Sequence, residues 1–408
     1  MKRIPILTLI LITVVLCSNC QKTELTGPSN KPDPCFKNGV DTCNALKLII
    51  TVNINDEKQT IENFGASDCW TTKFIGKWAN TQKKDQIADY LFSTDTLANG
   101  SPKGIGLTMW RFNIGSGSFE QGVDSGIPDE YRREECFLSP DGTYNWNKHV
   151  GQKWFLEAAK KRGVKDFLAF SLTPPVQLTQ NGKAYGLGTP QHNLKAGLGN
   201  DYADFLVNVV EYFNKNGYPM RYLSPFNEPQ WNWGSNGTSQ EGSAATNTQI
   251  ANFVKILGPK LKKVNSPTTI TVGEAAQWNF LNTTYNDGRG NQLTDFFSSN
   301  STNYLGNIPN VEPVMSAHSY FTTCSPNLIN FRQNVLNNKN QISPTMRLWQ
   351  SEFGILGDVC GQYKGSPKNV SIDYGLYVAK VIHHDLAYAN VSGWQWWLSV
   401  SQIGRAHV

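Results

Sequence analysis

A regular alternation of short apolar runs with longer amphipathic segments constrains the fold most. Helical periodicity is clearest from Tyr202, where apolar residues follow at offsets of three, four, seven, eight and eleven, and it returns from Ile250 to Leu261. Each amphipathic segment is followed by a turn and a short strand-like run, such as Tyr222–Phe226 or Ile270–Glu274. Strands that alternate with helices predict βα units and a parallel sheet.

Eight strands are predicted in this way. They are Glu62–Ser67, Leu107–Asn113, Phe167–Leu172, Tyr222–Phe226, Ile270–Glu274, Pro313–Ala317, Arg347–Gln350 and Gly393–Trp397. Eight strands with intervening helices match a (β/α)8 TIM barrel. An open doubly wound sheet is the alternative, but such a sheet usually carries a nucleotide loop, and neither GxGxxG nor GxxxxGK[ST] occurs. We therefore predict an α/β fold with a catalytic (β/α)8 barrel over residues 61–401.

The first twenty residues are interpreted as a lipoprotein-type signal peptide. A basic start precedes an apolar stretch from Ile4 to Leu16, which is too short to span a bilayer comfortably. The ending LCSNC resembles a loose lipoprotein box in which Cys20 would be acylated, with ordinary cleavage nearby as the alternative. Residues 21–45 are predicted to be a flexible polar tether. We expect an exported bacterial cell-envelope lipoprotein of the outer membrane, on its periplasmic or outer face, with membrane contact through the lipid anchor alone.

Two further segments lie outside the predicted barrel. Residues 46–60 include an alternating run from Leu48 to Ile54, assigned to the first strand of a side β-domain that strands after the barrel would complete. The ending IGRAHV matches the translation of a common sequencing-library adapter, so residues 402–408 are interpreted as read-through. The chain would then lack its last barrel helix and most of a side β-sandwich. An exposed strand edge would follow, and we expect poor stability.

Composition limits the partners and cofactors. The 37 basic and 32 acidic residues are scattered, so no basic block is present to follow a phosphate backbone, and no nucleic acid partner is expected. Export would permit disulfides among Cys35, Cys43, Cys69, Cys136, Cys324 and Cys360. No CxxC pair or HExxH motif occurs. We predict no metal and no cofactor, and we expect a monomer.

Polar side chains stand where predicted strands end, which is where barrel enzymes carry their active sites. They are Asp68, Arg111, Asn113, Asn227, Glu228, Glu274, His318, Tyr320 and Glu352. Glu228 and Glu352 both follow short strands near aromatic residues, about three βα units apart, which places them across the barrel mouth. Two carboxyl groups can hydrolyse a glycosidic bond, one as a neutral acid and one ionised. The competing interpretation is a solvated loop glutamate in each case. Glu274 is the chief competitor, as a substrate ligand or as an anchor for Arg111.

Aromatic residues near these carboxylates suggest a carbohydrate cleft, because the apolar C–H faces of sugar rings stack on indoles. The candidates for substrate contact are Trp110, Trp231, Trp278, Tyr320, Trp394 and Trp396. Alternation along GWQWW sends Trp394 and Trp396 to one face and Trp397 to the other, and Trp397 is assigned to the core. Core packing is the alternative for the remaining tryptophans.

Seven segments occur in an order that resembles family 30 glycoside hydrolases, and most of all the endo-β-1,6-galactanase-like branch. They are FGASDCW, WRFNIGSGS, LTPPVQLTQNG, SPFNEPQW, SAHSYF, WQSEFG and WQWWLSVS, spread over residues 46–401. The resemblance implies a retaining double displacement with Glu228 as acid/base and Glu352 as nucleophile. It also implies that Asn227 binds the sugar 2-hydroxyl and that Arg111 orients the nucleophile. One departure, Leu172 and Thr173 before the Pro-Pro pair where relatives often have an aromatic and serine, puts the subsite shape there in doubt.

These observations lead to ranked hypotheses about function. The first is an exported retaining endo-β-glycosidase that hydrolyses a polysaccharide of the β-1,6-galactan type. A β-1,6-glucanase or a xylanase of the same family is the alternative within this class. A non-catalytic surface glycan-binding lipoprotein and a structural envelope lipoprotein are the alternatives outside it. The presence of both glutamates favours an enzyme, since a binding protein has no need of them.

Overall fold

The structure, a computed structural model, describes residues 36–37, 40–41, 51–234, 238–367 and 369–401. The signal peptide with Cys20, most of the tether, Cys35, Cys43 and residues 402–408 lie outside the described residues. The chain divides into two units, Met1–Lys58 and Gln59–Val408. In the first unit, β1 (Phe36–Lys37) and β2 (Val40–Asp41) pair antiparallel within the stretch predicted to be a tether.

The predicted side strand from Leu48 to Ile54 is not formed in its described part. Residues 51–60 contain no strand, and residues 46–50 lie outside the described residues. An alternating segment becomes a strand only when a partner satisfies its backbone N–H and C=O groups. The segment has no such partner in the part of the chain that the structure describes.

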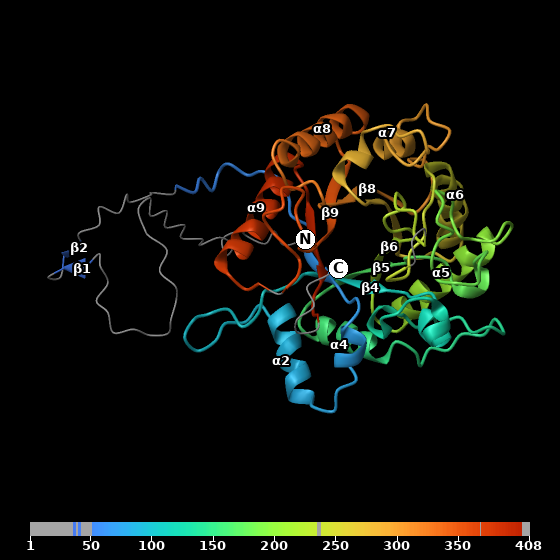
Figure 1. The fold of residues 1–408 in the computed structure, drawn as a ribbon, viewed down its shortest axis with the longest axis horizontal. Helices are drawn as coiled ribbons and strands as arrows, with labels where there is room; N and C mark the ends of the chain where they lie inside the picture. Colours follow the sequence, from blue (N-terminus) through green and yellow to red (C-terminus); the bar gives the residue numbers. More distant parts are fainter. Residues whose placement is uncertain (1–35, 38–39, 42–50, 235–237, 368, 402–408) are drawn as a thin grey trace. The chain divides into compact units, whose positions relative to one another are not determined.

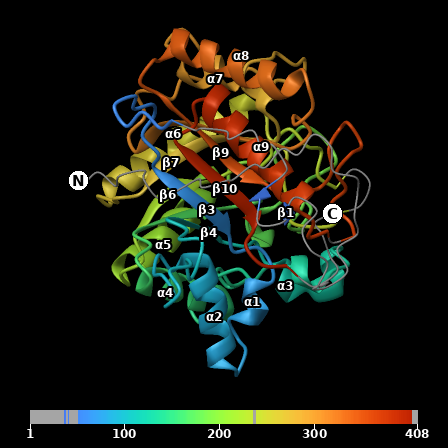
Figure 2. The same cartoon turned by 90° about the vertical axis from the view of Figure 1, so that its left-hand side faces the viewer.

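The second unit is built around a closed, all-parallel barrel, as predicted. Its strands are β3 (Asn63–Ser67), β4 (Met109–Asn113), β5 (Asp166–Phe170), β6 (Met220–Ser224), β7 (Thr269–Ala275), β8 (Val311–His318), β9 (Arg347–Phe353) and β10 (Gly393–Leu398). The first and last barrel strands, β3 and β10, lie side by side and close the sheet (Figure 2). All eight predicted strands are present. The largest boundary difference is at β9, which continues three residues past the predicted end at Gln350 and so contains Glu352.

Helices surround the barrel (Figure 1). The α-helices are α1 (Thr72–Ile75), α2 (Thr81–Phe92), α3 (Ser118–Gln121), α4 (Val150–Lys161), α5 (Gly199–Lys215), α6 (Asn247–Lys263), α7 (Gln292–Phe297), α8 (Asn327–Ile342) and α9 (Ile372–Tyr388), with short 3₁₀ turns η1 (Gly122–Ser125), η2 (Glu130–Arg132), η3 (Val176–Leu178) and η4 (Trp278–Leu281). The described residues include no helix with the length and apolar character needed to cross a bilayer.

The two predicted helical stripes are the buried faces of α5 and α6. In α5 every residue of the stripe from Tyr202 to Phe213 is buried. The start of α6 is fixed by a capping box, in which the Thr246 side chain accepts from the Gln249 backbone N–H while the Gln249 side chain accepts from that of Thr246. The helices thus bury the apolar faces that the sequence pattern identified.

A buried ion pair fastens the outer side of the last strand to the helix layer. Arg332 on α8 donates from Nε to Asp385 on α9 at 2.6 Å, and both side chains are fully buried. The other oxygen of Asp385 accepts from Trp394 Nε1 at 2.9 Å. Trp394 therefore faces the helices, and it stacks on Trp396 with ring centroids 6.1 Å apart. The two tryptophans do share a face, as alternation predicted, but it is the outer face of the barrel.

Cysteine pairing braces the segments that follow two neighbouring strands. A disulfide joins Cys324, after β8, to Cys360 in the connection between β9 and α9. Cys69 and Cys136 are buried free thiols.

Replacing Asp385 by alanine should lower the free energy of unfolding by about 3–5 kcal/mol, because it leaves the Arg332 charge buried and unpaired. Urea unfolding followed by circular dichroism measures the change. Asp373, exposed in the first turn of the same helix, is the matched control. Its replacement by alanine should cost less than about 1 kcal/mol. Equal costs for the two variants would contradict this role for the ion pair.

Candidate active site

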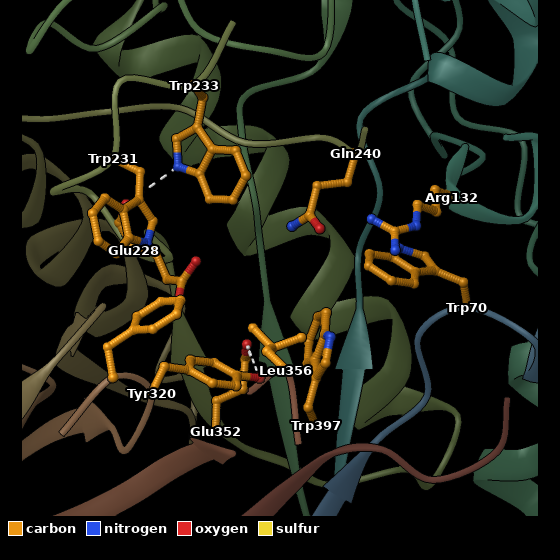
Figure 3. A pocket seen from close by; sticks show the side chains of 11 residues that line it. Trp70, Arg132, Glu228, Trp231, Trp233, Gln240, Tyr320, Glu352, Leu356 and Trp397 are labelled. Carbon is orange, nitrogen blue, oxygen red and sulfur yellow. Dashed lines mark hydrogen bonds between the residues drawn. The ribbon is translucent and has the colours of Figure 1, made fainter. Parts of the chain in front are cut away.

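A cavity of about 380 Å³ opens at the carboxyl ends of the barrel strands, a volume in the range of small-ligand sites. Figure 3 shows the side chains that line it. They are Trp70, Arg132, Glu228, Trp231, Trp233, Gln240, Tyr320, Phe321, Glu352, Leu356 and Trp397. The two glutamates predicted to carry the chemistry therefore face one cavity, with aromatic side chains around them.

Glu352 is held by two hydrogen bonds that fix its orientation. One oxygen accepts from Arg111 Nη1 at 3.1 Å, and the other accepts from the Tyr320 hydroxyl at 3.2 Å. Arg111 reaches it from β4 and is fully buried. The Arg111 contact agrees with the predicted anchoring of this glutamate. The ring of Tyr320 lies on the cavity wall beside it (Figure 3).

Glu228 is placed by the turn that follows β6 and by a histidine from β8. Its backbone lies in the left-handed region with φ of 45°, which is unusual for a residue other than glycine. His318 Nδ1 lies 2.9 Å from Glu228 Oε1. Trp233 Nε1 donates to the backbone carbonyl of Glu228 at 3.2 Å, shown as a dashed line in Figure 3. One contact to its carboxyl group and one to its backbone carbonyl thus hold Glu228, whose side chain lines the cavity.

Glu274 lies beneath these residues and does not line the cavity. A register shift in the pairing of β7 with β8 between Val272 and Ala275 marks an irregularity, and Gly273 within it has φ of 102°. Bulges of this kind re-aim side chains beside active sites. The Glu274 side chain, 1% exposed, accepts from Arg111 Nη2 at 2.9 Å and lies 3.2 Å from His318 Nε2.

The charges of this cluster shift one another's protonation. Burial disfavours a charged imidazole, but the carboxylates of Glu352, Glu228 and Glu274 raise the pKa of His318 to about 10. Burial would raise the pKa of Glu274, yet Arg111 and His318 outweigh it and lower that pKa to about 2. Burial raises the pKa of Glu352 to about 7. The positive charges of His318 and Arg111 oppose this rise, and the carboxylates of Glu228 and Glu274 add to it. Near neutral pH, His318 is therefore a cation and Glu274 an anion.

The wall across the cavity from Glu228 is aromatic and comes from the segment after β3, from η2 and from β10. Trp70 and Trp397 meet edge to face with centroids 5.2 Å apart, and the Arg132 guanidinium lies 4.8 Å over the Trp70 ring. Figure 3 shows this group across the cavity from Glu228, with Gln240 between. Trp231 lies on the near side, edge to face with Phe321 at 6.3 Å. A ring-shaped, partly apolar ligand fits between such walls.

Ten of the twelve residues predicted to contact substrate do not line the cavity, and six of these ten belong to the core, to the outer face of β10 or to the junction of β3 and β4. Trp110 packs in the core between Phe92 and Phe155. The Trp278 indole is fully buried and donates to Ser319 Oγ. The others are Trp394 and Trp396 on the outer face of β10, and Asp68 and Asn113, whose shared hydrogen bond ties β3 to β4. The sequence prediction therefore included too many residues in the site. It relied on strand-end position and aromatic character, and neither property indicates which face of a strand a side chain occupies.

The remaining predicted residues lie at or just beneath the cavity. Trp231 and Tyr320 line it, and Arg111, Glu274 and His318 form the buried layer that supports the glutamates. Asn227 is buried, and its Oδ1 has no hydrogen-bond partner among the described residues. An unsatisfied buried acceptor next to Glu228 is a feature that a ligand hydroxyl would satisfy.

Seven lining residues were absent from the sequence prediction. They are Trp70, Arg132, Trp233, Gln240, Phe321, Leu356 and Trp397. Alternation along a strand predicts which residues share a face, but it does not predict which face lines the inside of the barrel. For this reason Trp397 was assigned to the core. Trp233 stood close to Glu228 in sequence and was within reach of the same argument. The others lie in segments with no periodicity, so sequence carried little signal for them.

Two groups of side chains have donor types suited to a metal ion: Glu228 with His318 and Glu352, and Cys324 with Asp358 and Cys360. In the first group both ring nitrogens of His318 lie against carboxylates, and its raised pKa keeps it protonated, whereas metal ligation requires a neutral imidazole. In the second group both sulfurs are joined in a disulfide. Neither arrangement favours a metal, and its absence from the reaction stays a prediction.

Comparison with known proteins agrees with this geometry. The model of O-glycosyl hydrolase family 30 matches residues 47–406, nearly the whole chain.

The chain belongs to glycoside hydrolase family 30.

The chain is also similar to an endo-β-1,6-galactanase from Hypocrea rufa, 24% identical over 227 residues that cover 52% of this chain and 46% of that protein. The chain thus spans about half the length of this curated relative. Among solved structures, a conserved exported protein from Bacteroides fragilis is 33% identical with a TM-score of 0.79, covering 84% of this chain and 70% of that one. A family 30 xylanase C catalytic domain from Talaromyces cellulolyticus, 21% identical with a TM-score of 0.56 over 84% of this chain and 68% of that one, shares the fold.

The raised pKa of His318 predicts a loss of stability at alkaline pH. Its ordinary pKa is 6.5 and its folded value is about 10, so the folded state binds the proton more tightly. This stabilisation is complete below pH 6.5 and is lost as pH rises to about 10. Urea unfolding at a series of pH values should show a smaller decline for His318→Gln than for the wild-type protein across this window. His383→Gln, on the exposed face of α9, should decline like wild type. Parallel curves for all three proteins would contradict the charged state of His318.

Proposed function

We propose that this protein is an exported retaining endo-β-glycosidase that hydrolyses a polysaccharide of the β-1,6-galactan type. The single observation that carries the proposal is the approach of Glu228 and Glu352. Ligand-capable oxygens of these two carboxyl groups lie within 4.8 Å of each other at one cavity. Retaining enzymes place their two carboxyl groups about 5–5.5 Å apart, whereas inverting enzymes need about 6.5–9.5 Å to admit a water molecule.

The surroundings of the two glutamates support distinct roles. Glu352 is fixed by Arg111 and Tyr320, which hold its oxygens in place for attack on the anomeric carbon. Glu228 has one oxygen against His318 and the other free of any described contact, so it can carry a proton to the leaving oxygen and later take one from water. In this mechanism Glu352 forms the covalent glycosyl intermediate as the leaving group departs, and water then releases the sugar from it.

The choice of sugar rests on the relatives. The similarity to the Hypocrea rufa endo-β-1,6-galactanase supports β-1,6-galactan as the substrate. A β-1,6-glucan or a xylan is the alternative within the family, since an endo-β-1,6-glucanase and a xylanase share the fold at 19% and 21% identity. The Asn227 Oδ1 that lacks a partner would accept a hydrogen bond from a sugar hydroxyl beside the scissile bond. A monomer attached to the cell envelope through Cys20 completes the proposal.

Replacing Glu352 by glutamine should abolish hydrolysis while leaving glycan affinity nearly unchanged, because the nucleophile acts only in the chemical step. Replacing Glu228 by alanine should lower kcat on oligosaccharides by about 10²–10⁴-fold. Azide should partly restore turnover of an activated aryl glycoside by Glu228→Ala, giving a β-glycosyl azide.

Both variants are checked by sugar release, by calorimetric glycan binding and by NMR of the first-formed anomer, which should be β. Hydrolysis unchanged in Glu352→Gln would show that the nucleophile assignment is wrong. Glycan binding by a wild-type protein that releases no sugar would support a non-catalytic binding protein instead.

The substrate proposal predicts that wild-type protein releases oligosaccharides from β-1,6-galactan faster than from β-1,6-glucan or glucuronoxylan. Product length resolved by chromatography distinguishes endo from exo action, and an endo enzyme should give mixed oligosaccharides at early times. Preferential release from glucan or xylan would replace galactan as the substrate while leaving the two glutamates in their roles.

A further inference from the structure

Glu274 is linked to both proposed catalytic glutamates through different atoms. Its backbone carbonyl accepts the N–H of Glu228 at 2.9 Å. Its side-chain Oε2 accepts from Arg111 Nη2 at 2.9 Å, and the same guanidinium holds Glu352 through Nη1 at 3.1 Å. Oε2 also lies 3.2 Å from His318 Nε2, whose Nδ1 lies 2.9 Å from Glu228. One carboxylate is thus linked to the acid/base by the histidine and to the nucleophile by the arginine.

The backbone at Glu274 is held in an uncommon conformation. Its φ is 44°, and the residue it bonds, Glu228, has φ of 45°. Residues other than glycine in the left-handed region are uncommon and gather at functional sites, where the surrounding structure holds them. Gly273 just before it approaches β8 so closely that a Cβ would lie 2.5 Å from the Ser316 carbonyl oxygen. The fold therefore maintains an unfavourable local geometry that directs this one carboxylate inward.

Glu274 is placed to act without touching the sugar. It is 1% exposed and is not among the residues that line the cavity. Its second oxygen, Oε1, accepts from Ser316 Oγ at 2.8 Å, so both oxygens are already used. We therefore interpret Glu274 as an anchor that holds both Arg111 and His318, and no longer as a substrate ligand.

The charges of the cluster leave one carboxyl without a countercharge. Three carboxyl groups, Glu228, Glu274 and Glu352, face two cations, Arg111 and His318. In a buried site an uncompensated charge is costly, so the cluster favours binding one proton on a carboxyl. With Glu274 committed to both cations, that proton is left to the pair that faces the substrate. A glycosidase needs this state, in which one carboxyl is neutral and the other ionised.

We propose that Glu274 is a positioning residue that keeps His318 protonated on both ring nitrogens, so that His318 donates to Glu228 Oε1 and leaves Oε2 of Glu228 to carry the proton for the leaving group. This inference rests on the proposed function for its kinetic consequences. Its electrostatic part concerns the protein alone and can be measured without a substrate.

The groups that face His318 define what its protonation depends on. Glu228 approaches from the connection after β6, Glu274 from β7 and Glu352 from β9, at 2.9, 3.2 and 3.7 Å. The ring of Tyr320 stands edge to face with its centroid 5.8 Å away. Arg111 is paired with the same two carboxylates, Glu274 and Glu352, so its positive charge disfavours protonation of His318. Of the three carboxylates, Glu274 alone faces Nε2, so its loss removes the acceptor that favours a proton there.

The test replaces Glu274 by glutamine in the full chain and follows the imidazole nitrogens by long-range ¹H–¹⁵N NMR, with His318→Gln to assign the signal. In wild-type protein both nitrogens should stay protonated to about pH 9, in keeping with the pKa of about 10. In Glu274→Gln the titration should move at least about one pH unit lower. Ser316→Ala is a second variant, which keeps the Glu274 charge and removes two hydrogen bonds, one from the Ser316 hydroxyl to Oε1 and one from the Glu274 backbone N–H to that hydroxyl. It should move the His318 titration less than Glu274→Gln does.

The kinetic test uses the same variants on the best glycan substrate. Glu274→Gln should lower kcat by about 10–100-fold with KM within about threefold, because the lost interaction acts on the reacting groups and not on sugar binding. The alkaline limb of kcat/KM should move to lower pH together with the NMR titration, since removing one negative charge weakens proton binding by the whole cluster. Glu274→Asp, which restores the charge, should regain part of the activity. Glu312→Gln, which removes an ion-paired carboxylate from the neighbouring β8 at Arg347, should change neither measurement.

An unchanged His318 titration in Glu274→Gln would overturn the proposal, as would a titration that shifts while kcat and the pH profile stay at wild-type values. A rise in KM with unchanged kcat would instead make Glu274 a determinant of sugar binding. If wild-type protein releases no sugar from any glycan, the proposed function fails, while the NMR titration still decides whether Glu274 holds the proton on His318.

Discussion

The buried Arg111 guanidinium is the interaction on which the site depends. It is fully buried and divides its two terminal nitrogens between Glu352 and Glu274. Removing a charged group from water costs several kcal/mol unless partners compensate it, and removing one member of a buried pair is strongly destabilising. Each of these side chains therefore requires the others, and His318 joins them to Glu228. Arg111 and His318 together hold carboxylates of like charge close to one another.

The barrel brings this cluster together by small departures from regular pairing. In the pairing of β8 with β9 the register shifts just before His318, which then stands opposite Glu352. A second shift, between β7 and β8, turns Glu274 toward the same point. A bulge changes the direction of a side chain without ending the strand, so the groups remain on rigid elements. Arg111, Glu274, His318 and Glu352 thus stand on strands. Glu228 follows β6 in a turn and is oriented by His318 from β8.

The sequence predicted the scaffold well because hydrophobic periodicity reflects burial, and burial is what the barrel and its helices share. It also predicted that Glu228 and Glu352 lie at one site, since each ends or follows an apolar run beside aromatic residues, and the structure brings both to one cavity. It could not decide the faces of the last strand: alternation correctly paired Trp394 with Trp396, but their outward direction is set by the buried Asp385 on α9. Trp70, Arg132 and Gln240 reach the cavity from loops, and only the folded chain brings such residues together.

The two walls of the cavity consequently have different freedom to vary. The wall that carries the glutamates is fixed by charge pairing, so a substitution there changes the chemistry itself. The opposite wall rests on three buried carboxyl groups, each within two residues of a lining side chain: Asp68 near Trp70, Glu134 near Arg132, and Glu241 beside Gln240. Burial raises the pKa of Glu134 to about 7 and that of Glu241 to about 8. Glu134 pairs with the buried Lys73 at 3.4 Å, and Glu241 accepts from the Ser118 hydroxyl at 2.6 Å. Changes in these loops can therefore reshape this wall of the cavity while Arg111 and its partners keep their geometry, so one scaffold can carry different sites.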